Sequence, residues 1–347
     1  MVSARAPLPS RRALVGGCLA GALGLAGCAR TTGAGRADAE PVTGSTFAFD
    51  TYCTFTVYGD DAAPAKLARA CARYDALFDL YDEDSDIARV NAAGGAPVRV
   101  DPDTVALVSR GLELSAESDG RFDITIGAVS TLWDFTAGVR PTDSSIADAL
   151  GHVDWRAVHV DEDASTIRLD DAEAKLDLGG IAKGFIADRL LELLETETDA
   201  VAAVLSLGGN VAFFGTKPDG GPWDAGVRDV DDPGGSRILG TAHIDGGSLV
   251  TSGLYERTFE LDGETYWHIL DPRTGMPVET DVASVTVLCP SSTVADALST
   301  TLFIAGSFEG ARIAARHDGT EAYFVLRDGS SAETPGWQDA TGFTAEP

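Results

Sequence analysis

The chain has 347 residues and a formal net charge of −28, from 26 basic and 54 acidic residues. Hydrophobic residues make up 44% of it, enough for a large buried core, which excludes a disulfide-stapled mini-protein, a coiled coil and a disordered chain. The acidic excess excludes a protein that coats nucleic acid, because affinity for a phosphate backbone needs many Lys and Arg. An anionic ligand would have to be held locally, by a metal ion, a helix N-terminus or a few placed cations.

The N-terminus is predicted to be an export signal. A basic segment precedes the apolar stretch 13–26, which is shorter than the roughly 20 residues that span a bilayer. Small residues then lead directly into Cys28, a pattern typical of a bacterial lipoprotein whose Cys carries the lipid. An ordinary secretory peptide is the alternative. We expect a signal peptide over 1–27, lipid on Cys28, a flexible tether over 28–45, and a protein anchored on the extracytoplasmic face of the cell membrane.

Hydrophobic periodicity predicts both strands and helices in the first half of the chain. In chain order these are a strand over 47–58, helices over 64–80, 85–91 and 103–118, a strand over 172–178 and a helix over 181–195. Ser85 is the expected cap of the short second helix, because its hydroxyl can accept a hydrogen bond from a free N–H of the first turn. Residues 142–170 are interpreted as a variable insertion.

The second half is predicted to be rich in strands. Gly208 and Gly209 separate two apolar runs, which is a hairpin signal. The expected strands cover 201–207, 211–215, 223–228, 238–244, 248–251, 256–261, 264–269, 284–289 and 322–326, and the expected helices cover 294–305 and 308–316. Long helices combined with antiparallel strands favour the α+β class. We expect one large domain over 46–330, with mostly antiparallel strands and flanking helices, and a C-terminal tail over 331–347.

The segment DLGGIAKG, residues 177–184, is a candidate anion site. A strand that passes through Gly179 and Gly180 into a helix leaves backbone N–H groups free at the helix start. Lys183 adds a positive charge in the first turn and is one of only four lysines in the chain. The structural alternative is a tight strand-to-helix turn with a surface lysine.

A candidate cation site lies in the helix predicted over 294–305. Asp296 and Thr300 are four residues apart and therefore share one face of that helix. A carboxylate and a hydroxyl suit a hard divalent cation such as Mg²⁺, which completes its shell with water and ligand phosphates. The alternative is a solvated aspartate and a threonine whose hydroxyl bonds to its own helix.

The motif HILDPRTG, residues 268–275, combines a candidate base with a candidate phosphate ligand. His268 lies beside an aromatic residue, an Asp and an Arg, and its imidazole can accept a proton near neutral pH. Arg273 could donate two hydrogen bonds to a phosphate. The structural alternative is a hydrogen-bonded strand histidine and an Asp–Arg pair that closes a turn.

Six motifs taken together resemble the FAD:protein FMN transferases, a family of bacterial flavin transferases with many lipoprotein members. In chain order the motifs are GRFDITIG, DLGGIAKG, LSLGGN, TSGLYER, HILDPRTG and ADALSTTLFIAG, and the resemblance covers residues 43–330. It implies a single α+β unit in which a Thr or Ser hydroxyl of an acceptor flavoprotein attacks the diphosphate of FAD. AMP is released, and FMN stays ester-linked to the acceptor, which in this family is a redox-complex subunit or an extracytoplasmic reductase.

The resemblance also implies roles for individual residues. His268 would be the base that deprotonates the incoming hydroxyl. Asp296 and Thr300 would hold Mg²⁺ together with the backbone carbonyl of Gly180. The expected FAD-binding residues are Ser85, Arg121, Phe122, Asp123, Asp177, Lys183, Ile269 and Arg273.

Some positions depart from the family pattern. Phe49-Asp50-Thr51 stands where the family often has Met-Gly-Thr, which leaves the stacking contact of that methionine without its usual residue. Leu254 replaces a common Asp, and Ile124 replaces a Pro. Two other functions fit the same motifs: an Mg²⁺-dependent FAD pyrophosphatase that gives FMN and AMP, and a non-catalytic flavin-binding lipoprotein.

Overall fold

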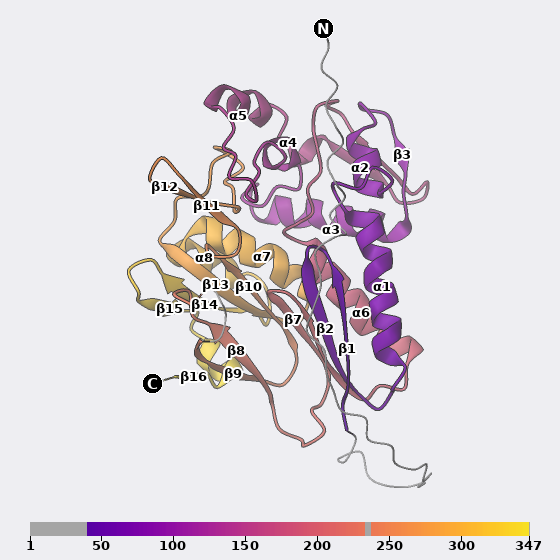
Figure 1. Cartoon of the computed structure of the whole chain (residues 1–347), viewed down its shortest axis with the longest axis vertical. Coiled ribbons are helices and arrows are strands. Elements are labelled where there is room, and N and C mark those ends of the chain that lie inside the picture. Colours follow the sequence, from indigo (N-terminus) through magenta and orange to yellow (C-terminus); the bar gives the residue numbers. More distant parts are fainter. Residues whose placement is uncertain (1–39, 233–236, 347) are drawn as a thin grey trace. The chain divides into compact units, whose positions relative to one another are not determined.

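The computed structural model describes residues 40–232 and 237–346, and its largest sheet has eight strands in the order β1-β2-β6-β7-β10-β13-β14-β15 (Figure 1). The strands are β1 (Val42–Ala48), β2 (Thr51–Tyr58), β6 (Ala202–Leu207), β7 (Asn210–Gly215), β10 (Gly247–Gly253), β13 (Val282–Cys289), β14 (Glu321–Leu326) and β15 (Ser331–Glu333). Every neighbouring pair in this sheet is antiparallel, which confirms the predicted α+β class with mostly antiparallel strands. The predicted signal peptide and Cys28 lie outside the described residues.

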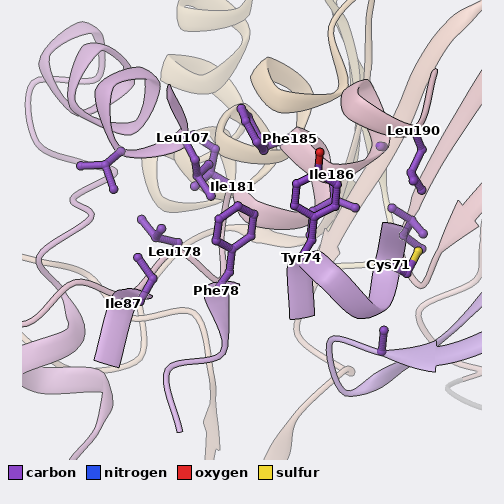
Figure 2. Close-up of a cluster of buried hydrophobic side chains, with 14 of the residues drawn as sticks. Cys71, Tyr74, Phe78, Ile87, Leu107, Leu178, Ile181, Phe185, Ile186 and Leu190 are labelled. Atoms are coloured by element: carbon purple, nitrogen blue, oxygen red, sulfur yellow. The ribbon is translucent and has the colours of Figure 1, made fainter. Parts of the chain in front are cut away.

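Helices pack on one face of this sheet and against one another. They are α1 (Ala63–Phe78), α2 (Asp86–Asn91), α3 (Pro102–Glu117), α6 (Ala182–Glu197), α7 (Ser292–Ala305) and α8 (Ser307–Ala314). The stripe Leu67, Cys71, Tyr74 and Phe78 of α1 has helical spacing and is buried, as its periodicity predicted. Figure 2 shows Cys71, Tyr74 and Phe78 of this stripe facing apolar side chains of α6, including Phe185. Residues of α7 and α8 form a second apolar cluster with β10, β13 and β14.

A second layer covers the opposite face of the sheet. It contains β8 (Trp223–Arg228), β9 (Ile238–Ile244), α9 (Trp337–Thr341) and β16 (Thr344–Ala345). Val287 of β13 belongs to the cluster with α7, whereas its neighbour Leu288 packs with Trp337, because successive strand residues point to opposite faces. All eight residues of β13 are therefore buried. The segment predicted as a C-terminal tail, 331–347, is instead folded through residue 346, because the apolar Trp337 needs burial and β15 pairs with β14.

Two predicted strands differ from the structure. The segment 47–58 is not one strand: the predicted tether overlaps β1, and Phe49 and Asp50, both with φ of 56°, turn the chain from β1 into β2. A two-residue turn with two positive φ angles matches the twist of a hairpin, and the alternating pattern continues through it. The strand over 172–178 is also wrong, because only Lys175 forms a bridge there, to Ile126.

The remaining elements are strands of two smaller sheets and three short helices. A three-stranded sheet contains β3 (Val98–Arg99), β5 (Thr166–Leu169) and β4 (Val158–Asp161), and β11 (Thr258–Leu261) pairs with β12 (Glu264–Trp267). The short helices are α4 (Gly127–Ser130), α5 (Asp143–Leu150) and η2 (Trp155–Ala157). Ile167 and Leu169 of β5 belong to the main core, so part of 142–170 contributes to its packing. Across 40–232 and 237–346, the helices lack the length and apolar character of a membrane span.

Candidate active site

The candidate site forms where the first turn of α6 meets α7. The two helices touch at Gly184, where a Cβ atom would lie 2.2 Å from the carbonyl oxygen of Ser292 and 2.7 Å from the Cβ of Asp296. The backbone N–H of Gly184 donates a hydrogen bond of 2.8 Å to Oδ2 of Asp296. Glycine is therefore required at position 184, because any side chain would separate the helices.

The three residues predicted to hold a metal come together. Asp296 and Thr300 lie on α7, and a Cβ on Gly180 would be 3.2 Å from Oγ1 of Thr300. Asp296 is only 5% exposed, and burial raises the pKa of its carboxyl, while the charge of Lys183 acts in the opposite direction. No ion pair to Asp296 is formed within the described part of the chain, so its carboxylate lacks a directly bonded cation.

This donor set fits a hard cation. A buried carboxylate is costly unless it is paired, and Mg²⁺ binds one or two carboxylates and keeps several water ligands. In the regions that the structure describes, no three His, Cys, Asp or Glu side chains cluster in a way that could hold a metal. A metal at Asp296 would therefore depend on one carboxylate, the Thr300 hydroxyl and the Gly180 carbonyl, together with water and ligand oxygens.

The turn before α6 is held from two sides and presents free donors. Asp177 accepts a hydrogen bond from the N–H of Gly179 at 2.9 Å and another from the hydroxyl of Ser130 at 2.6 Å. Nζ of Lys183 reaches back to the carbonyl oxygen of Gly179 at 3.3 Å. The N–H groups of Gly180 and Lys183 have no partner among residues 40–232 and 237–346. This is the arrangement expected of an anion site at a helix start.

His268 follows β12 and is half-buried. The backbone N–H of His268 donates to the carbonyl oxygen of Arg257 at 3.2 Å. The ring nitrogen Nδ1 is buried without a hydrogen-bond partner in the described structure. Nε2 is therefore the ring nitrogen available to a substrate. Burial, together with the positive charges of Arg257 and Lys183, lowers the pKa of His268 to about 4. The imidazole is neutral at neutral pH, as a base must be.

Some of the predicted FAD-binding residues adjoin this cluster. A Cβ on Gly180 would be 3.1 Å from Cε2 of Phe122, so this ring lies against the turn before α6. Ile269 follows His268 and is buried with residues of β10 and β13. Asp123 accepts hydrogen bonds from Thr125 and from the N–H of Trp155, which fixes the adjoining loops. Their contacts with FAD stay predictions.

The side chains of Ser85, Arg121 and Arg273 are engaged within the fold. Ser85 accepts a hydrogen bond from the N–H of Ala88 at 3.0 Å, which confirms the predicted cap, and its hydroxyl donates to a carbonyl oxygen. Arg121 donates to the carbonyl oxygen of a neighbouring turn. Arg273 pairs with Asp271 at 3.1 and 3.3 Å and closes a turn, as the structural alternative described. A role of these residues in binding FAD stays a prediction.

Sequence reasoning missed several polar residues around the site. Tyr81, 78% exposed, lies within range of the charges of Asp177, Arg257 and Asp50. Glu256 lies beside the β6–β7 turn, where a Cβ on Gly209 would be 3.2 Å from its Oε1. The signals were present, since Tyr81 is an aromatic residue in the loop before Ser85, and Glu256 and Arg257 belong to the motif TSGLYER.

Two surface hollows lie elsewhere. One of about 240 Å³ is lined by Asp188 and Arg189 of α6 and by neighbours on α3 and α7; Asp188 accepts a hydrogen bond from the hydroxyl of Thr293, and Arg189 pairs with Glu192. Another of about 560 Å³ is lined mostly by apolar residues near Lys217, which pairs with Asp224. Neither offers a base or a cation that is free for a ligand. The converging polar groups at α6 and α7 are therefore the better candidate site.

The fold and this cluster define an α+β protein in which a buried carboxylate, a hydroxyl and a helix start with free N–H groups come together. Residues 49–324 match the ApbE family, and the chain belongs to that family. It is similar to a protein of Treponema pallidum (strain Nichols) named FAD:protein FMN transferase, with 35% identity covering 85% of this chain and 87% of that protein.

Solved structures agree with the same fold. The ApbE protein of Thermotoga maritima MSB8 has a TM-score of 0.79 and 30% identity, covering 86% of this chain and 99% of that chain. The apo form of the Pseudomonas stutzeri flavinyl transferase ApbE has a TM-score of 0.75 and 28% identity, covering 88% of this chain and 97% of that chain. The resemblance drawn from six motifs is thus confirmed.

Proposed function

We propose that this chain transfers the FMN part of FAD to a Thr or Ser hydroxyl of an acceptor flavoprotein and releases AMP. The names of its relatives support the reaction class. The observation that carries the proposal is the meeting of Asp296, Thr300 and Gly180 at one point. Lys183 and the neutral imidazole of His268 lie near this point, so cation, anion and base functions share one site.

The chemistry divides among these groups. Mg²⁺ bound at Asp296 and Thr300 would neutralise charge on the diphosphate. The open N–H groups at the start of α6 and the ammonium of Lys183 bind and orient the same diphosphate. The acceptor oxygen bonds to the FMN phosphorus while the bond from that phosphorus to the AMP oxygen breaks. The hydroxyl proton passes to Nε2 of His268, and AMP leaves with the electron pair.

The test is an incubation of the purified protein with FAD and Mg²⁺, with and without an acceptor flavoprotein. We expect mass spectrometry to show FMN added to one Thr or Ser of the acceptor, with one AMP released for each FMN transferred. Equal AMP release without acceptor would instead identify an FAD pyrophosphatase. FAD binding without any AMP would identify a flavin-binding protein. The matched control is an acceptor in which the modified Thr or Ser is replaced by Ala.

We also propose that the protein is anchored on the extracytoplasmic face of the cell membrane through lipid on Cys28. The support is the order of basic segment, apolar stretch, small residues and Cys at the N-terminus. We expect a Cys28→Ser variant to lose incorporated lipid and to leave the membrane fraction. Retention of the variant in that fraction would contradict the anchor.

A further inference from the structure

We propose that Arg257 is a second cation, besides Lys183, that binds the substrate diphosphate, and that Asp50 holds its guanidinium until substrate arrives. This inference deepens the proposed function and rests on it. It concerns the last residue of the motif TSGLYER, for which the resemblance implied no role, and this residue lies on a different chain segment from the predicted cation and anion sites.

The position of Arg257 follows from strand pairing. Thr258 of β11 pairs with Trp267 of β12, so the next pair in the antiparallel register is Arg257 and His268. The hydrogen bond from the N–H of His268 to the carbonyl oxygen of Arg257 extends the pairing to this pair. Side chains directly opposite each other in an antiparallel pair project from the same face. The guanidinium therefore starts beside the proposed base.

The guanidinium of Arg257 is available to a ligand. Its single ion pair, within the described ranges, joins Nη2 to Oδ2 of Asp50 over 3.8 Å, which is too long for a hydrogen bond. The two side chains are 58% and 60% exposed, and an exposed pair at this distance contributes little. An incoming anion can replace Asp50 at small cost.

Asp50 and Arg257 lie on turns that adjoin one another. It lies in the β1–β2 turn, and the following residue, Thr51, approaches Gly208 so closely that a Cβ there would be 2.9 Å from its Oγ1. The next glycine, Gly209, lies against Glu256. The β1–β2 turn, the β6–β7 turn and residues 256–257 thus form one border of the site. Asp50 occupies the position where the related motif has Gly, so this pair is a feature of this chain.

Charge explains why a second cation is needed. The chain carries a net charge of −28, and Glu256, Asp177 and Asp296 surround the site. Mg²⁺ at Asp296 would be partly neutralised by that carboxylate, so Mg²⁺ and Lys183 together would balance a diphosphate with two negative charges only in part. A guanidinium can donate two parallel hydrogen bonds to phosphate oxygens, which an ammonium cannot do.

The experiment compares ligands with and without a diphosphate. Dissociation constants for FAD, ADP and riboflavin are measured by calorimetry in saturating Mg²⁺ for the wild type, Arg257→Ala and Arg257→Lys. We expect Arg257→Ala to weaken FAD and ADP by about 10- to 100-fold and to leave riboflavin unchanged, because only the first two carry the diphosphate. Arg257→Lys should recover part of the loss, since it keeps the charge but not the fork.

Asp50→Asn tests whether Asp50 holds the guanidinium of Arg257 before substrate binds. We expect FAD and ADP to bind about two- to fivefold more tightly in this variant at low salt, because a competing negative charge is removed. The gain should vanish when Arg257→Ala is also present. The matched control is Arg312→Ala, which removes an exposed arginine of α8 that pairs with Glu309 and should change none of the constants.

Two results would overturn the inference. Unchanged FAD and ADP affinity in Arg257→Ala would show that the guanidinium does not bind the diphosphate. Equal losses for riboflavin and FAD would show a structural role. Failure of the proposed function looks different: ADP would still bind in an Arg257-dependent manner, but no FMN would reach an acceptor.

Discussion

The α6–α7 contact and the border of turns around it are built differently. At the contact, Gly184 allows the helices to touch, and Asp188 of α6 accepts hydrogen bonds from the hydroxyls of Ser291 and Thr293 and from N–H groups at the start of α7. At the border, Asp50 and Arg257 are exposed and loosely paired. The hydrogen bonds of the helix contact hold the Asp296 side of the site in a fixed position, whereas exposed groups can exchange partners when a ligand arrives.

The largest expected effect comes from breaking the helix contact. Gly184→Val places a side chain where a Cβ atom alone would lie 2.2 Å from a backbone oxygen. We expect the free energy of unfolding to fall by about 3 kcal/mol or more, with loss of Mg²⁺ binding, because the helices must separate. Urea denaturation measures the change. Gly246→Val is the control, since no atom lies within 4 Å of a Cβ there; equal losses in both variants would contradict the contact.

Asp296→Asn tests the charge at the same contact without changing its shape. We expect the rate of AMP formation to fall about 10²- to 10³-fold, because the amide cannot replace a carboxylate ligand. Without metal the variant should be at least as stable as the wild type at neutral pH, since a buried unpaired charge is removed. Calorimetry with Mg²⁺ and thermal unfolding check the two expectations. Mg²⁺ affinity equal to that of the wild type would refute the metal assignment.

The expected effect of His268→Gln is between the effects of changes at the helix contact and changes at the border of turns. We expect FMN transfer to fall about 10²-fold or more while FAD binding is retained, because the lost group accepts a proton and does not hold the diphosphate. In the wild type, kcat/KM should fall only below a pH of about 4, where the imidazole becomes protonated. A lowered pKa in the folded state also means that stability decreases as pH falls from about 6.5 to about 4.

The stability of His268→Gln should not show this decrease at low pH, and unfolding curves at several pH values would measure the difference. Loss of FAD binding in His268→Gln would make the residue structural. A transfer rate that already declines near pH 6.5 would contradict the lowered pKa of the imidazole.

Ser85→Ala is the mildest test and concerns the loop that carries Tyr81. Removing the cap of α2 should lower the free energy of unfolding by about 1 kcal/mol, because one N–H loses its acceptor. FAD affinity should change less than in Arg257→Ala. A larger loss of affinity at unchanged stability would show that Ser85 itself contacts FAD.

Local chemistry explains what could be predicted along the chain. The Ser85 cap, the α1 stripe, the Gly208–Gly209 hairpin and the start of α6 all depend on residues within a few positions of one another. Helical spacing alone was enough to predict that Asp296 and Thr300 share one face of a helix. At Phe49 and Asp50 the alternating pattern continues through a turn, so the prediction of one strand was wrong there.

By itself, the sequence determined the α+β class, most helices and strands, and the motifs that place the chain in its family. Only the tertiary structure decided that Gly180 meets Thr300, that Arg257 lies opposite His268 and that Trp337 closes a second layer on the sheet. The physical reason is range: hydrogen bonds and side-chain spacing within one element are set by neighbours in the chain. Contacts between elements depend on how their apolar faces pack, which distant residues determine together.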